Sequence, residues 1–214
     1  MPRASAPPAT SRKPTGIRMA PQITPRRMER IRRVLGWRQK DLTLVLANIH
    51  DPHNVSAIYR SCDAFGVAQV HLYYTDTAFP VLGRKSSASA RKWVDTVRHS
   101  DAQSLMRTLK EGGHRVLATS CTPAAKPLGD YDMTQPTAII MGNEHSGVAP
   151  ELVELVDGEV YIPMYGMIQS FNVSVAAAVL LAEASRQRVL AGMYDRPSWP
   201  EEELEARIAD WAEK

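Results

Sequence analysis

The stretch that decides the fold is Leu42-Thr-Leu-Val-Leu-Ala47, a nearly continuous run of apolar and β-branched residues. A run of this length and composition predicts a strand that is buried on both faces of a parallel sheet. A helix is expected after it, from about Pro52 to Phe65, where Gly66 closes it. The next apolar run, Gln69–Tyr74, predicts a second strand. Strand, helix and strand in this order form the unit from which parallel sheets are built.

The same alternation continues along the rest of the chain. A long loop is expected at 75–91, and one helix lies between the N-cap Asp101 and the pair Gly112-Gly113. Further strands are predicted at 92–97, 114–120, 137–141 and 159–162, and further helices at 151–156, 172–191 and from Pro200 onward. The predicted fold class is therefore α/β, with a mostly parallel, doubly wound sheet. In such sheets ligands bind beyond the carboxyl ends of the strands.

Extensions are predicted on both sides of a central domain that spans residues 41–192. Residues 1–25 form a basic, proline-rich tail that we expect to be disordered. Residues 26–40 are predicted to form a helix with Met28, Ile31 and Leu35 on an apolar face and Arg26, Arg30 and Arg33 on a basic face. Residues 193–214 form a C-terminal helical extension whose apolar stripe is Leu204, Ile208 and Trp211.

Charge is distributed unevenly along the 214 residues. The first 40 residues hold eleven Lys and Arg against the single acid Glu29, whereas the rest of the chain holds 15 basic and 22 acidic residues. This asymmetry fits a polyanionic partner such as RNA. Taken alone, it fits a solubilising tail about equally well.

Several classes of protein are not supported by the sequence. The longest apolar run, Val173–Ala182, ends at Glu183 and is shorter than the roughly 20 residues that a membrane span needs. The N-terminus lacks the apolar segment of a secretory signal, and Cys62 and Cys121 stand apart from each other and from any His cluster. We therefore expect a reduced, cytoplasmic protein without a membrane anchor or a structural metal.

Polar residues follow the first predicted strand and open its helix. Asn54 lies near the helix N-terminus, where side chains cap the helix or meet anions. Arg60 lies about 200° around the helix axis from the apolar residue Ile58, and is therefore expected to point away from the core. Taken alone, the two residues also fit a plain helix cap and an exposed arginine.

Two later segments have the same position after a strand. In Ile140-Met-Gly142-Asn-Glu144-His-Ser-Gly147 a strand enters a glycine turn with one carboxylate, which fits a plain turn as well as a site. The pattern G-x-x-x-x-G-K-[ST] of a phosphate loop is absent. In Ile162–Ala178 a strand ends at Pro163, and a loop leads to Ser170-Phe-Asn172 and a small-residue helix. The backbone groups of this loop are free to meet a ligand, although a well-packed helix with a Ser or Asn cap is the alternative.

Together and in this order, the three segments resemble the motifs of the SpoU/TrmH group of SPOUT methyltransferases. They match N-x-x-x-x-x-N-x-x-A-x-x-R, G-x-E-x-x-G and I-P-M-x-G-x-x-x-S-x-N-x-S-x-A. The resemblance extends from about residue 26 to the C-terminus, and Phe171 stands where the group usually has Leu. Tyr194-Asp-Arg-Pro197 and the Trp-bearing terminal helix resemble the branch that methylates guanosine 18 of tRNA.

The resemblance implies a fold, a cofactor and a set of site residues. It implies a C-terminal deep trefoil knot that binds S-adenosylmethionine, and a homodimer with the active site at the subunit interface. The implied cofactor-binding residues are Met141, Gly142, Ile162, Met164, Gly166, Met167, Ser170 and Asn172. The implied catalytic and pocket-shaping residues are Arg60, Asn54, Glu144, Ser170 and Asn172.

The expected activity is methylation of a ribose 2′-OH in tRNA, with guanosine 18 as the expected nucleoside. Arg60 acts either as the general base or as a charged stabiliser of the developing alkoxide, and the second role is favoured because arginine stays protonated. Contacts to tRNA are expected from Arg26, Arg30, Arg33, Arg84, Lys85, Arg91, Lys92, Arg186, Arg188 and Arg196. The alternatives are a ribosomal RNA methyltransferase of the same group and a catalytically silent RNA-binding protein. A Rossmann enzyme is not supported, because G-x-G-x-x-G is absent.

Overall fold

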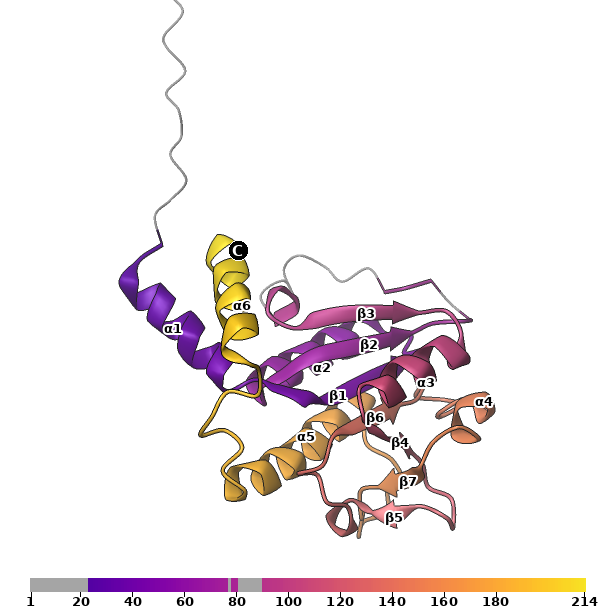
Figure 1. Ribbon diagram of the computed structural model, residues 1–214. Coiled ribbons are helices and arrows are strands. Elements are labelled where there is room, and N and C mark those ends of the chain that lie inside the picture. Colours follow the sequence, from indigo (N-terminus) through magenta and orange to yellow (C-terminus); the bar gives the residue numbers. More distant parts are fainter. Residues whose placement is uncertain (1–22, 77, 81–89) are drawn as a thin grey trace, which may run out of the picture.

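A computed structural model describes residues 23–76, 78–80 and 90–214, and its centre is a parallel sheet (Figure 1). Within this part of the chain the sheet has seven strands in the order β3-β2-β1-β6-β4-β7-β5, and all neighbours run parallel. The strands are β1 Gln39–Ala47, β2 Val67–Tyr73, β3 Asp95–His99, β4 Arg115–Thr119, β5 Lys126–Pro127, β6 Thr137–Met141 and β7 Gly158–Tyr161. The predicted mostly parallel sheet is therefore confirmed.

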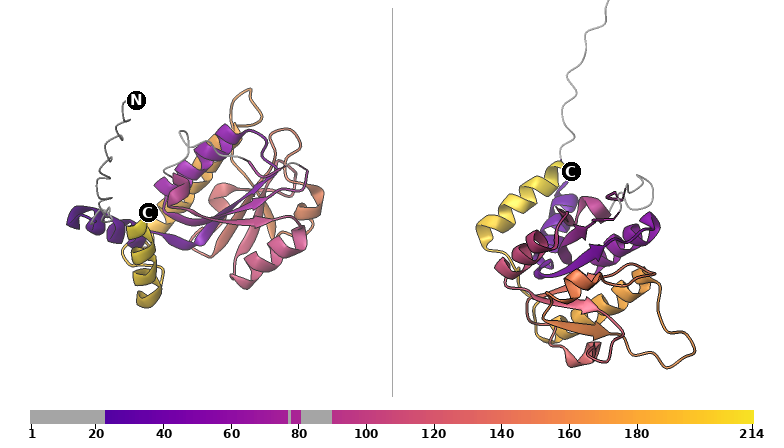
Figure 2. Two further views of the ribbon diagram at one scale, coloured as in Figure 1. Left: turned by 90° about the horizontal axis from the view of Figure 1, so that it is seen from above. Right: turned by 90° about the vertical axis from the view of Figure 1, so that its right-hand side faces the viewer.

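Helices cover both faces of the sheet (Figure 2). They are α1 Pro25–Gly36, α2 Pro52–Ala64, α3 Ala102–Glu111, α4 Pro150–Val153, α5 Val173–Leu190 and α6 Glu201–Glu213, with short 3-10 helices η1 Ala90–Lys92 and η2 Leu128–Asp130. On one face, α2 and α5 bury Ile58 and Leu180 against the sheet. On the other face, α3 and α4 bury Leu105 and Leu152. This arrangement confirms the doubly wound fold class, and the trefoil knot stays a prediction from the resemblance.

The predicted elements agree with the structure except at their ends and at the short β5, which the sequence did not indicate. The third strand begins at Asp95 and ends at His99, three and two residues later than the prediction of 92–97. Residues 90–92 form the 3-10 helix η1 instead. The predicted cap is confirmed at Asp101, whose carboxylate accepts from Ser104 N. The alternative of an Asn cap in the third segment also holds, because the Asn172 side chain accepts from Ser174 N.

The N-terminal and C-terminal helices pack on each other beside the amino ends of β1 and β2 (Figure 1). Ile31 and Leu35 of α1 and Ile208 and Trp211 of α6 share one buried cluster, which confirms both predicted apolar stripes. The predicted helix over 26–40 is too long, because α1 ends at Gly36. Gln39 already belongs to the sheet, where its backbone N–H donates to the carbonyl of Gly66 at 2.7 Å.

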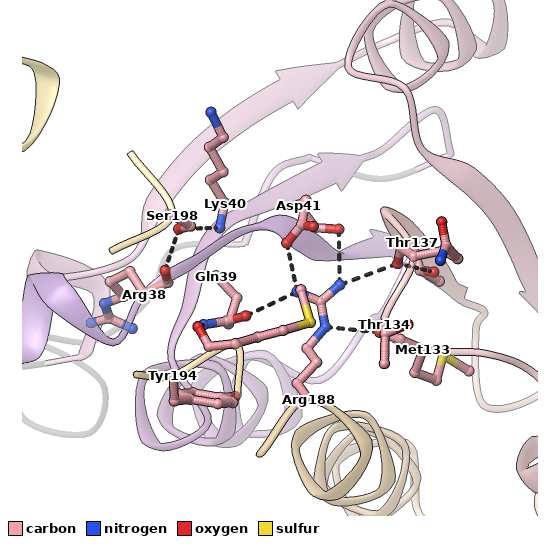
Figure 3. A network of polar contacts seen from close by, with 12 residues as sticks. Arg38, Gln39, Lys40, Asp41, Met133, Thr134, Thr137, Arg188, Tyr194 and Ser198 are labelled. Carbon is pink, nitrogen blue, oxygen red and sulfur yellow. Dashed lines mark hydrogen bonds and ion pairs between the residues drawn. The ribbon is translucent and has the colours of Figure 1, made fainter. Parts of the chain in front are cut away.

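Arg188 of α5 is a correction to the predicted tRNA contacts, because its side chain is fully buried beneath β1 (Figure 3). Its guanidinium donates to Asp41 Oδ1 at 2.5 Å and to the carbonyl of Gln135 at 3.2 Å, and its Nε donates to the carbonyl of Met133 at 2.8 Å. A guanidinium with these partners is not available to a phosphate. It joins α5 to the amino-terminal part of β1 and to the segment that leads into β6.

We expect Arg188→Ala to lower the free energy of unfolding by about 3 kcal/mol, because it leaves Asp41, the buried carbonyl of Met133 and the carbonyl of Gln135 without their donor. Arg186→Ala is the matched control, since Arg186 lies on the same helix but is exposed and pairs with Glu183. The control should unfold at the same urea concentration as the wild type. Equal stability of the two variants, with weaker RNA binding by Arg188→Ala alone, would contradict the interior role of Arg188.

Candidate active site at the carboxyl edge of the sheet

The site begins where β1 and β6 end side by side. The two strands pair in parallel up to Leu46 and Met141, so the segments that follow them leave the sheet at the same edge. Asn48 continues from β1, and Gly142 and Asn143 continue from β6. The Asn143 side chain donates from Nδ2 to the carbonyl of Asn48 at 2.9 Å. Two predicted segments that are far apart in sequence are thereby brought into direct contact.

Asn54 is held in the first turn of α2 by two other site residues. Asp51 caps this helix by accepting from His53 N at 2.8 Å, so the interpretation of Asn54 as a simple cap is wrong. Instead, Asn54 donates from Nδ2 to Glu144 Oε1 at 2.7 Å. Its Oδ1 accepts from Nδ2 of Asn172 at 3.1 Å. One chain of hydrogen bonds therefore joins the three predicted segments.

Asn172 has a second role as the N-cap of α5. Its Oδ1 accepts from the backbone N–H of Ser174 at 2.8 Å and from the Ser174 hydroxyl at 2.6 Å. Since the oxygen is used by the helix start, the amide nitrogen is directed toward Asn54. The cap thus sets the orientation of the residue that completes the Glu144–Asn54–Asn172 chain.

Arg60 and Ser170 are exposed and are not joined to that chain by a hydrogen bond. Arg60 lies on the solvent side of α2, as predicted, while Val55, Ile58 and Cys62 of the same helix are buried. Among the residues that the structure describes, neither side chain has a hydrogen bond or an ion pair. Both remain free to contact a substrate.

The predicted cofactor residues fall into two groups. Met141 and Gly142 are buried at the end of β6, whereas Gly166, Met167 and Ser170 are exposed in the loop between β7 and α5. Ile162 and Met164 at the start of that loop are partly buried. Within the described chain, the backbone groups of residues 163–171 make no hydrogen bonds. Free N–H and C=O groups in one loop fit a cofactor that is held mainly by the backbone.

Gly142 is a position where the backbone leaves no room for a side chain. A Cβ atom there would lie 2.2 Å from the carbonyl carbon of Gly147 and 2.3 Å from Val148 N. The close approach comes from a closed turn, in which Asn143 and Gly147 exchange two backbone hydrogen bonds of 2.9 Å each. Gly147 has φ +70, which glycine adopts without strain. Both glycines of the second motif are therefore required by geometry.

A buried tyrosine supports the loop after β1. The Tyr74 hydroxyl donates to the carbonyl of Ile49 at 2.9 Å, and burial raises the pKa of Tyr74 above its usual range. The hydroxyl therefore stays protonated and remains a donor at neutral pH. It fixes the backbone just before the cap of α2.

The other predicted tRNA contacts differ in their surroundings. Arg26, Arg30 and Arg33 of α1, together with Arg91, Lys92 and Arg196, are exposed. Arg186 is exposed and paired with Glu183, and Lys92 Nζ donates to the carbonyl of Lys214. Arg84 and Lys85 lie outside the described residues.

No helix in the described chain is long and apolar enough to cross a membrane. The His, Cys, Asp and Glu residues of the described chain form no cluster of three or more that could hold a metal ion.

The sequence interpretation missed two residues with a structural role in the site, Asn48 and Asn143. Asn48 directly follows β1, and Asn143 follows β6 after Gly142. A position just after a strand is the same signal that indicated the other segments. What could not be read from the sequence is their contact, because it depends on the pairing of β1 with β6.

Comparisons with known proteins agree with this geometry. Residues 41–182 match the SpoU rRNA Methylase family. The chain is 47% identical over 191 residues to the tRNA (guanosine(18)-2′-O)-methyltransferase of Thermus thermophilus, covering 89% of this chain and 98% of that protein. It is 39% identical over 190 residues to the Aquifex aeolicus protein of the same name, covering 89% and 90% of the two chains.

Solved structures give the same result. The crystal structure of the A. aeolicus TrmH/SpoU tRNA modifying enzyme matches with a TM-score of 0.82 and 40% identity, over 87% of this chain and 95% of that one. The SpoU methyltransferase AviRb from Streptomyces viridochromogenes, solved in complex with AdoMet, matches with a TM-score of 0.63 and 28% identity, over 71% and 62% of the chains.

We expect Gly142→Ala to lower the free energy of unfolding by about 2 kcal/mol, because the added methyl group meets backbone atoms that cannot move aside independently. It should also weaken the binding of S-adenosylmethionine, measured by titration calorimetry. Gly129→Ala is the control, since nothing lies within 4 Å of a Cβ atom there. Wild-type stability and cofactor affinity in Gly142→Ala would refute the close packing of the turn.

Proposed function

Because the chain belongs to the SpoU rRNA Methylase family, we propose that it transfers the methyl group of S-adenosylmethionine to the ribose 2′-OH of guanosine 18 in tRNA. The observation that carries the proposal is the Glu144–Asn54–Asn172 chain, which assembles the three segments at one edge of the sheet. The relatives named for this reaction are similar over nearly their whole length, which supports the choice of nucleoside. A tRNA substrate also supports a cytoplasmic location.

The cofactor site is proposed at the end of β6 and in the loop before α5. When bound, S-adenosylmethionine supplies a methyl group on a sulfonium, which is a good leaving group. Gly142 and the unpaired backbone groups of residues 163–171 would hold it. The remaining task of the protein is to align the ribose oxygen and to raise its reactivity.

Arg60 is proposed to stabilise negative charge as it develops on the ribose O2′. Its guanidinium is exposed on α2, the helix that carries Asn54. Because arginine keeps its proton in proteins, it acts as a charge and a donor and does not act as a base. Asn54 is held on one side by Glu144 and on the other by Asn172, and it orients the ribose. The basic face of α1 and the exposed residues Arg91 and Arg196 contact tRNA phosphates.

We expect the purified protein to transfer label from S-adenosylmethionine to unmodified tRNA and to form 2′-O-methylguanosine at position 18, as mapped by mass spectrometry. A tRNA with 2′-deoxyguanosine at that position should accept no label. Arg60→Ala should lower kcat by about 100-fold or more with unchanged cofactor affinity, because it removes charge stabilisation in the transition state.

The matched control is Arg107→Ala, an exposed arginine on α3, which covers the opposite face of the sheet. It should keep wild-type activity. Label in ribosomal RNA but not in tRNA would show that ribosomal RNA is the substrate. No label in either RNA would contradict the proposed reaction.

A homodimer with the active site at the subunit interface is supported by exposed apolar residues next to the site. Tyr165, Met167 and Ile168 are 97%, 99% and 63% exposed, and Phe171 and Val175 continue the patch onto α5. Monomeric proteins seldom leave so many neighbouring apolar side chains in water. A second copy that covers the loop would also add residues to the site.

We expect the wild type to sediment as a dimer at micromolar concentration and Ile168→Asp to sediment as a monomer. The introduced carboxylate would be buried at the interface without a partner. Val189→Asp is the control, because Val189 is exposed to a similar extent, 58%, at the far end of α5. A monomeric wild type would overturn the assignment of this loop to an interface.

A further inference from the structure

Asn143 is a buried polar residue whose side-chain oxygen and nitrogen both form hydrogen bonds. It is 8% exposed, and its Oδ1 accepts from the backbone N–H of His145 at 2.8 Å. Its Nδ2 donates to the carbonyl of Asn48 at 2.9 Å and lies 3.2 Å from Nε2 of His50. One amide group therefore shapes the turn in which it lies and also fastens that turn to the end of β1.

The partner of Asn143 is itself held in an unusual conformation. Asn48 has φ +48 and is the only residue other than glycine with a positive φ in the described chain. Asn adopts this left-handed region more readily than most residues. Here Oδ1 accepts from Thr75 N at 3.0 Å, and Nδ2 donates to Thr75 Oγ1 and Asp76 Oδ2 at 3.1 Å each. These bonds fix the direction of the Asn48 carbonyl toward Asn143.

The turn that Asn143 fastens carries Glu144. The next residue after Asn143 is exposed, yet its carboxylate reaches Asn54 with a short hydrogen bond of 2.7 Å. A glutamate on a loose turn would lose side-chain entropy to make this contact. A turn closed by Asn143 and tied to β1 presents the carboxylate close to its bonded position, so less conformational entropy is lost when the contact forms.

We propose that Asn143 is a positioning residue for methyl transfer, which acts by holding Glu144 against Asn54 through the bond from its amide to Asn48. The inference rests on the proposed function and adds a residue to its site. A catalytic side chain must be held in place by neighbouring contacts, because a small displacement of a reacting group lowers the reaction rate by a large factor.

The test uses variants that separate the acceptor role of the Asn143 side chain, toward His145 N, from its donor role, toward the carbonyl of Asn48. Asn143→Asp keeps an oxygen to accept from His145 N but replaces the donor to Asn48 by an oxygen, which repels the carbonyl. Asn143→Ser is a second variant that keeps an acceptor and introduces no charge. Both are measured by single-turnover methylation of unmodified tRNA, cofactor affinity and thermal unfolding.

We expect each variant to lower the single-turnover rate by about tenfold in the wild-type background and by less than about twofold in Glu144→Ala, because residues that act through one another are not additive. Cofactor affinity should stay unchanged. The control is Gln187→Glu, which also keeps an acceptor for Met133 N and loses the donor to the carbonyl of Tyr131, at a place remote from the site. It should lower the unfolding temperature with no loss of rate.

Equal losses in both backgrounds, or a loss of rate in Gln187→Glu that follows its loss of stability, would overturn the role of Asn143. If the wild type methylates tRNA and the cycle shows no coupling, this inference fails alone. A wild type that methylates no RNA overturns the proposed function and this inference with it.

Discussion

The parallel pairing of β1 with β6 is the constraint on which the rest of the structure depends. It brings together the ends of two strands that are far apart in sequence, so that the segments starting at Asn48 and Gly142 leave the sheet next to each other. β2 and β4 lie on opposite outer sides of this pair. The connections from β1 and from β6 therefore diverge, and such a switch point is where open α/β sheets bind ligands.

Polar contacts complete the edge that the strands define. Burial of apolar side chains from α2 and α5 holds the two helices against the same face of the sheet, but this packing does not by itself set the positions of polar groups. The hydrogen bonds that Asn54 donates to Glu144 and accepts from Asn172 do so, because they join the turn after β6 and the start of α5 to the start of α2. The close contact at Gly142 adds a steric constraint, since the turn that carries Glu144 leaves no room for a side chain at that position.

The arginines of this chain have two distinct physical roles. Those on the solvent face of α1 stay exposed and form part of a basic surface. Arg188 is buried and neutralised by Asp41, and it ties α5 to the amino-terminal part of β1. A buried guanidinium requires several acceptors at fixed positions, which the carbonyl groups of Met133 and Gln135 provide. Charge counting along a sequence cannot separate the two roles.

The sequence by itself determined the fold class, the order of most elements, the caps Asp101 and Asn172, and the three polar segments. These features depend on local periodicity, on strand and helix ends and on short motifs, all of which are encoded by neighbouring residues. The sequence did not indicate the short β5 or the end of α1 at Gly36, where pairing with Gly66 draws Gln39 into the sheet. The tertiary structure alone decided that Asn54 bonds to Glu144, that Asn143 reaches Asn48 and that Arg188 lies inside. Each of these contacts joins residues about 90 or more positions apart, and only the packing of strands and helices brings such residues within hydrogen-bonding distance.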